Sequence, residues 1–121
     1  MPDQNEEIID FTEASQTVET VLFDLNSSNV KNSPELVEAA SYAHVTGLPV
    51  HIVGHACPLG EDDLNMVLGM RRAAAVKSSL IAQGVNREKI SIDSKGETQP
   101  ITNDPDEYAQ NRRAEITIGG L

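Results

Sequence analysis

Apolar and polar positions along this chain follow the two periods that distinguish strands from helices. Short apolar or alternating runs predict strands, at residues 20–25, 49–53, 90–93 and 114–118. Longer amphipathic segments predict two helices, at residues 34–46 and 62–83. A loop rich in Gly, Pro, Asn and Asp is expected at residues 96–106, followed by a helical turn near residues 108–112.

Residues at the expected helix ends support both helices. Ser33 followed by Pro34 is a typical N-cap and first position, and Gly47 is expected to end that helix. Acidic residues 61–63 suit the positive N-terminal end of the second helix, and Gly84 is expected to follow its end.

The resulting order, β-α-β-α-β-β, predicts an α/β fold with two layers. Right-handed crossovers are expected to make the first three strands parallel neighbours and to place both helices on one face of the sheet. We therefore expect a two-layer sandwich with a mixed sheet of about four strands. Residues 1–18 are acidic and polar and are expected to be an N-terminal arm or linker, with residues 8–11 as a possible edge strand, and residues 19–121 are expected to be the domain.

Composition narrows the classes of function. The chain has 121 residues, a formal net charge of -10, 3% aromatic residues and no Trp. Such an acidic chain with few stacking side chains is a poor candidate for binding nucleic acid or an anionic membrane surface. One cysteine excludes an intrachain disulfide, and no apolar run is long enough for a signal peptide or membrane span.

One polar stripe of the second helix faces the expected core. A helical wheel places Asn65 and Arg72 on the same arc as three apolar residues, Leu68, Val76 and Leu80. A guanidinium turned inward needs a compensating group. Arg72 is therefore expected either to pair with an internal carboxylate, such as Asp24 or Glu115, or to bind an anionic ligand.

Several spaced motifs in the second half of the chain resemble one known family. They are Gly54-His55-Ala56, Gly60, Asn65, Leu68, Arg71-Arg72-Ala73, Gly96-Glu97, Pro100 and Asn111-Arg112-Arg113-Ala114-Glu115-Ile116, with Phe23 to Ser28 near the start. Together they resemble the OmpA-like peptidoglycan-associated domain, and most closely its peptidoglycan-associated lipoprotein branch. The resemblance covers residues 20–118. It implies a mixed α/β sandwich and non-covalent binding of a peptidoglycan stem peptide, usually through diaminopimelate in the periplasm.

The resemblance also implies a ligand pocket. An arginine of the family that binds the ligand carboxylate corresponds to Arg72, whereas the aspartate that binds the ligand ammonium is replaced here by Cys57. Glu61, Asp62 and Asp63 are close enough in sequence to substitute for this missing acid. The full set of expected ligand-binding residues is Arg72, Asn65, Cys57, Asn26, Arg112 and Arg113, while Asn111 is expected to brace its loop.

Catalysis and metal binding receive little support from the sequence. His55 and Cys57 share a strand face, but no oriented third group completes a nucleophilic site. The spacing of His51, His55 and Cys57 matches no zinc signature. We expect a chain that is not an enzyme and uses no cofactor or metal.

The leading hypothesis is therefore a peptidoglycan-binding module that anchors an envelope protein or complex. We expect it in the periplasm, associated with the outer membrane or envelope through an anchor absent from this chain. The alternative is a degenerate OmpA-like domain that serves a secretion or motility machine as a structural or protein-interaction module, without binding peptidoglycan.

Overall fold

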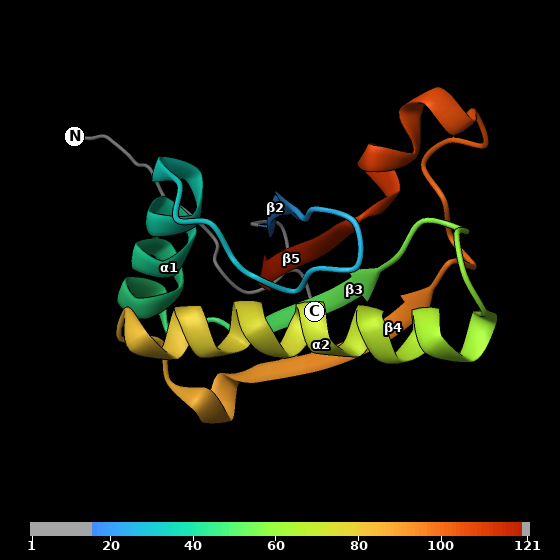
Figure 1. Ribbon diagram of the computed structural model, residues 1–121. Helices are drawn as coiled ribbons and strands as arrows, with labels where there is room; N and C mark the ends of the chain where they lie inside the picture. Colours follow the sequence, from blue (N-terminus) through green and yellow to red (C-terminus); the bar gives the residue numbers. More distant parts are fainter. Residues whose placement is uncertain (1–15, 120–121) are drawn as a thin grey trace.

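The computed structural model describes residues 16–119, and they follow the expected order of elements (Figure 1). The elements are β2 (Gln16–Leu22), α1 (Pro34–Thr46), β3 (Val50–His55), α2 (Asp62–Ala82), the 3-10 helix η1 (Arg87–Lys89), β4 (Ile90–Gly96), the 3-10 helix η2 (Pro105–Asn111) and β5 (Arg113–Gly119). The edge strand considered at residues 8–11 lies outside the described residues. Within the described residues no helix combines the length and apolarity needed to cross a membrane.

The four strands form one mixed sheet in the order β2-β5-β3-β4. β3 and β4 are parallel neighbours, as expected, and β5 is antiparallel to both β2 and β3. The expectation that β2 and β3 are neighbours is wrong, because β5 lies between them. The final strand arrives through a loop rather than a helical crossover, so it is free to run antiparallel and to fill the gap that α1 leaves between β2 and β3.

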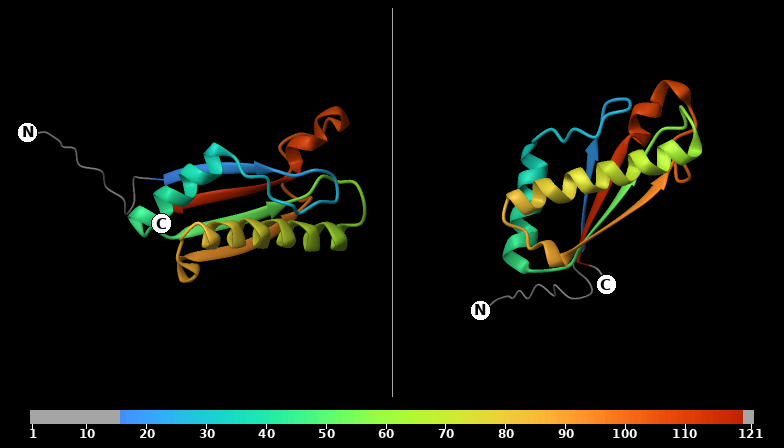
Figure 2. Two further views of the ribbon diagram at one scale, coloured as in Figure 1. Left: turned by 60° about the vertical axis from the view of Figure 1, so that its left-hand side comes forward. Right: turned by 60° about the horizontal axis from the view of Figure 1, so that its bottom comes forward.

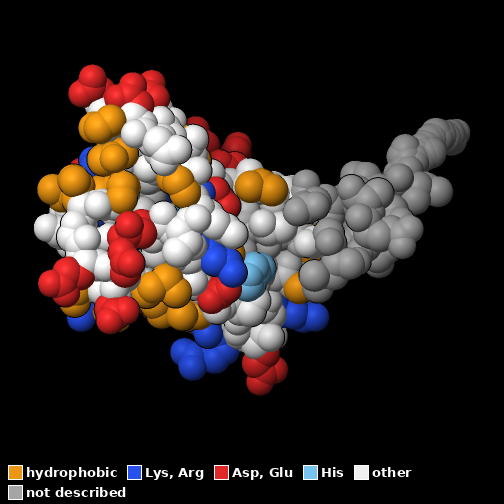
Figure 3. Space-filling view, turned by 90° about the vertical axis from the view of Figure 1, so that its right-hand side faces the viewer, with side chains coloured by type: hydrophobic (Ala, Val, Ile, Leu, Met, Phe, Trp, Pro, Cys, Tyr) orange, Lys and Arg blue, Asp and Glu red, His pale blue; other side chains and the backbone are white. Residues whose placement is uncertain are grey.

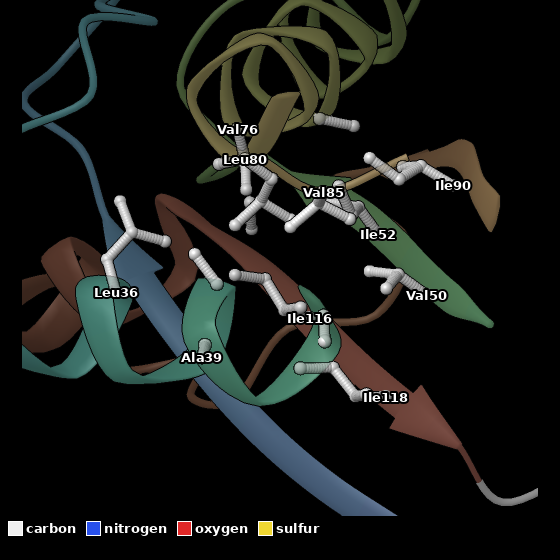
Figure 4. Close-up of a cluster of buried hydrophobic side chains, with 14 of the residues drawn as sticks. Leu36, Ala39, Val50, Ile52, Val76, Leu80, Val85, Ile90, Ile116 and Ile118 are labelled. Atoms are coloured by element: carbon white, nitrogen blue, oxygen red, sulfur yellow. The ribbon is translucent and has the colours of Figure 1, made fainter. Parts of the chain in front are cut away.

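Both α-helices lie on the same face of the sheet, which confirms the two-layer α/β sandwich (Figure 2). Figure 4 shows one aliphatic core in which Leu36 and Ala39 of α1 meet Ile116 and Ile118 of β5. Val76 and Leu80 of α2 complete the same core against β3. Within the described residues, the buried core consists of aliphatic and alanine side chains plus Phe23, and the partly buried Tyr42 packs against it.

The ends of the helices follow the local sequence, whereas the first strand does not. Ser33 Oγ accepts a hydrogen bond from Leu36 N at 3.1 Å, and Gly47 adopts a left-handed φ of 67° after α1. β2 spans Gln16–Leu22 instead of residues 20–25, because its pairing with β5 runs from Gln16↔Gly119 to Leu22↔Arg113. Its end at Leu22 coincides with the start of β5 at Arg113, and the residue pattern of β2 alone does not reveal this limit.

Helix α2 touches β3 backbone to backbone at two glycines. A Cβ atom on Gly54 would overlap the carbonyl of Gly69, and one on Gly69 would come within 2.8 Å of the carbonyl oxygen of Gly54. This close approach brings the N-terminal half of α2 onto the end of β3. It thereby sets how far the side chains of α2 reach into the loops beyond the sheet.

Candidate ligand-binding site

The polar residues singled out in the sequence gather at one end of the molecule. β2, β3 and β4 run in the same direction, so the loops that follow them meet at this end. The N-terminus of α2 and helix η2 lie there too (Figure 1). Figure 3 looks onto this end, where hydrophobic side chains lie among acidic ones.

Arg72 connects three segments at this end. Its side chain is 0% exposed. Nη1 donates to the carbonyl of His55 at 2.8 Å, Nε donates to Ser27 O at 2.8 Å, and Nη2 donates to Asp24 O at 3.0 Å. The Arg72 guanidinium also lies over the Phe23 ring, 5.2 Å from its centroid. One side chain of α2 thus holds the loop after β2 against the end of β3.

Neither of the two carboxylates considered as partners, Asp24 and Glu115, pairs with Arg72, and no other carboxylate within residues 16–119 does. The Asp24 carboxylate pairs with Lys31 at 3.2 Å, and Glu115 pairs with Arg113 at 2.7 Å. Carbonyl dipoles and an aromatic face compensate the buried cation instead. Burial lowers the pKa of Arg72 to about 10, and the neighbouring Cys57 opposes this shift while Arg112 adds to it. Arg72 therefore remains charged at neutral pH.

Cys57 and Arg112 lie near this buried guanidinium. Both act on the Arg72 charge, and the Cys57 side chain is buried with a free thiol. Arg112 is half-buried, and its Nε donates to Phe23 O at 3.0 Å, so it too fixes the start of the loop after β2. The structure thus brings the residue at the family's aspartate position beside Arg72.

A pocket of about 230 Å³ opens at the same end of the molecule, and Arg72, Cys57 and Arg112 are not among the residues that line it. Its lining includes Asn26, Leu59, Leu64, Asn65 and Leu68. Asn65 Nδ2 donates to Leu59 O at 3.3 Å and to Glu97 Oε1 at 2.8 Å, so it orients the loop after β3 and also lines the pocket. Asn26 has a positive φ of 57°, a conformation that asparagine tolerates better than most residues.

Arg113 points away from this pocket. Its neighbour Ala114 faces the helices, so Arg113 and Glu115 lie on the opposite face of the sheet. Arg113 Nε donates to Glu115 Oε2 at 2.7 Å and Nη2 donates to Gln99 O at 3.0 Å. Of the two neighbouring arginines, Arg112 is the one that the structure brings next to Arg72.

His55 shares the Arg113 face and is almost fully buried. Its Nε2 lies 3.6 Å from Glu115 Oε1, and neither ring nitrogen has a hydrogen-bond partner among the described residues. Burial, followed by the Arg113 charge, lowers the pKa of His55, although Glu115 opposes the shift. The Gly54-His55-Ala56 motif therefore contributes a close backbone contact at its first residue and a buried neutral imidazole at its second.

Two contributions were not identified from the sequence. Gly69 permits the contact between α2 and β3, but a helical glycine signals such a contact only when the partner strand is known. Arg71 lines the pocket although the inward stripe of α2 was centred on Arg72. A helical wheel that included the residues flanking the inward stripe would have identified Arg71.

The expected role of Asn111, which was to brace its loop, is confirmed. Asn111 Oδ1 accepts hydrogen bonds from Ile101 N and Thr102 N at 2.8 and 3.2 Å.

Comparison with known proteins agrees with this architecture. The chain is 36% identical over 109 residues to the peptidoglycan-associated lipoprotein of Pseudomonas putida, which covers 85% of this chain and 64% of that protein. It is also 36% identical over 111 residues to the photosystem I P700 chlorophyll a apoprotein A2 of Gloeobacter violaceus, covering 83% of this chain and 13% of that protein. The chain thus spans less than two thirds of either relative.

A solved structure and a family profile give the same result. The crystal structure of the peptidoglycan-associated lipoprotein from Burkholderia pseudomallei superposes with a TM-score of 0.76 at 30% identity, covering 82% of this chain and 88% of that one. The sequence profile of the OmpA family matches residues 22–114. The chain therefore belongs to the OmpA family.

Proposed function

We propose that this chain is a non-catalytic peptidoglycan-binding module that anchors an envelope protein or complex to the cell wall. The observation that supports it most directly is the pocket lined by Asn26 and Asn65 at the loop end of the sheet. Both residues occupy positions that the family resemblance assigns to ligand binding. Relatives of the chain are named peptidoglycan-associated lipoproteins, which agrees with this proposal.

The proposed ligand is a stem peptide that contains diaminopimelate. Asn65 and the backbone around Asn26 line its pocket, and Arg72 and Arg112 hold the walls in place through the carbonyls that they bind. Arg72 is fully buried, so a ligand carboxylate reaches its guanidinium only after the residues around it move. Arg113 lies on the opposite face of the sheet, on Glu115 and Gln99 O, and is not part of the proposed contact set.

The proposed location is the periplasm, in association with the outer membrane or the envelope. Peptidoglycan is the proposed main partner, and an envelope protein or complex is the proposed second partner. Curated relatives include an outer membrane protein A from Bordetella avium at 36% identity, of which the matched region covers 53%.

The alternative proposal is an interaction module in which the wall-binding pocket has degenerated. One observation favours it: the position of the family's aspartate holds a buried cysteine, and the neighbouring Arg72 uses its guanidinium on backbone carbonyls. Positions 57 and 72 therefore do not provide an exposed pair of a carboxylate and an arginine.

Binding to purified sacculi, followed by an NMR titration with a diaminopimelate-containing stem peptide, separates these two proposals. The chain is compared with Cys57→Asp, and with Cys57→Asn as the uncharged variant of matched size. Co-sedimentation of the unmodified chain, with amide shifts around Asn26 and Asn65, supports wall binding. Binding by Cys57→Asp alone supports the degenerate module, and no binding by any of the three rules out the pocket assignment.

A further inference from the structure

We propose that Glu61 and Arg71 form a substitute charge pair that binds the ammonium and the carboxylate of a zwitterionic ligand across the pocket. The inference rests on the proposed function, because it assigns the charged contacts of the same stem peptide. It places these contacts on Arg71, next to Arg72, and on Glu61, four residues after Cys57.

The first argument is position on the helix. Glu61 is the N-cap of α2, and residues 64, 65, 68 and 71 follow it at intervals of three or four, which places them along one face. Glu61 and Arg71 both line the pocket. Ten residues of helix extend for about 15 Å, and helical side chains lean toward the N-terminus, so the Arg71 side chain extends back toward Glu61.

The second argument is that both charges are available. The Glu61 side chain makes no capping hydrogen bond, although capping is the usual task of a polar N-cap side chain. Neither Glu61 nor Arg71 has a side-chain hydrogen bond or an ion pair with another residue in the described part of the chain. Both side chains are exposed, and they line one pocket without pairing with each other.

The third argument is that the residues next to them are not available. Cys57 is buried and carries no carboxylate, and Arg72 is fully buried with three carbonyls as partners. The lining of this pocket therefore holds one exposed acid, Glu61, and one exposed base, Arg71. Asp62 and Asp63, which were also considered as substitutes, are not part of the pocket lining.

The lining indicates the chemistry of the ligand. Leu59, Leu64 and Leu68 supply an apolar part of the lining, beside the two charged residues. The volume, about 230 Å³, is smaller than the pockets of about 300–1,000 Å³ that enclose drug-sized ligands. It suits one residue-sized group: a short aliphatic chain that ends in both an ammonium and a carboxylate. The free end of a diamino dicarboxylic acid residue has this chemistry.

The test uses three stem tripeptides that differ only at the last residue. One ends in diaminopimelate, one in lysine, which lacks the second carboxylate, and one in 2-aminopimelate, which lacks the second ammonium. Amide chemical shifts give the Kd of each peptide for the unmodified chain, Arg71→Gln and Glu61→Gln. The exposed residues Arg87 and Glu38 lie outside this pocket, so Arg87→Gln and Glu38→Gln are matched controls.

We expect each substitution to remove one kind of discrimination. Arg71→Gln lowers the affinity for the diaminopimelate peptide roughly 3- to 10-fold, as for a partly exposed charge contact, and binds this peptide and the lysine peptide equally well. Glu61→Gln lowers the affinity for the diaminopimelate peptide by a similar factor, and binds this peptide and the 2-aminopimelate peptide equally well. Both controls bind as the unmodified chain does.

Two outcomes overturn the inference in distinguishable ways. If the unmodified chain binds sacculi and the diaminopimelate peptide, and both pocket variants bind equally well, the substitute pair is wrong while the proposed function stands. If the unmodified chain binds neither sacculi nor peptide, the proposed function fails and the inference fails with it.

Discussion

Replacing Arg72 tests whether this side chain holds the site together. Arg72→Met keeps an unbranched side chain but removes the three donors to Asp24 O, Ser27 O and His55 O. A buried acceptor that loses its donor costs about 1–3 kcal/mol. Asp24 is exposed and Ser27 half-buried, so water compensates part of their loss, and about 1 kcal/mol for each carbonyl is appropriate. We expect a total loss of about 2–4 kcal/mol in the free energy of unfolding.

That loss is large compared with the free energy of unfolding of a typical domain, which is about 5–15 kcal/mol. Urea unfolding followed by circular dichroism measures it, and amide hydrogen exchange in the loop after β2 shows whether the loop is released. The exposed neighbour is the control, since Arg71→Met is expected to change stability by no more than about 0.5 kcal/mol. A loss below about 1 kcal/mol for Arg72→Met, with unchanged exchange in the loop, would refute the structural role assigned to this residue.

Three further predictions concern residues outside the pocket. Gly69→Ala forces a methyl group against Ser94 Oγ and the Gly54 carbonyl, and is expected to cost about 1–3 kcal/mol in thermal or urea unfolding; an unchanged midpoint would contradict the close contact. The pKa of His55 lies below its ordinary value of 6.5. Below that pH the unfolded chain therefore binds more protons than the folded one, and stability falls as the pH drops. His55→Gln should reduce the slope of the free energy of unfolding against pH between pH 7 and 5. An identical slope would count against a buried neutral imidazole. Asn111→Ala leaves Ile101 N and Thr102 N without their acceptor and should cost about 1–3 kcal/mol, with faster amide exchange at both residues.

The local sequence determined the elements whose signals are local. Ser33, Pro34 and Gly47 fixed α1 because capping and φ preferences depend on a few neighbouring residues. The apolar periodicity of α2 correctly identified Asn65, Arg72, Val76 and Leu80 as buried. It was wrong for Leu68, which is half-buried and lines the pocket instead of joining the core. The family resemblance, carried by motifs in a fixed order, then identified the family and its mixed sheet.

Pairing between distant segments was beyond the local pattern. The end of β2 at Leu22 matches the start of β5 at Arg113, and β5 lies in the gap that α1 leaves between β2 and β3. The residues of a strand do not predict its pairing partner or its ends, because the alternation of apolar and polar residues indicates which face is buried and not which strand is paired.

The binding site also depends partly on local sequence and partly on tertiary packing. The sequence determined that Arg72 points inward and must be compensated, since a helix wheel and the cost of burying a cation need only local information. Only the tertiary structure decided that the compensation comes from three carbonyls instead of a carboxylate. It also separated Arg112 from Arg113 by sheet face and left Arg71 exposed in the pocket. Those outcomes depend on how closely α2 approaches β3 at Gly54 and Gly69, a distance set by packing between segments far apart in the chain.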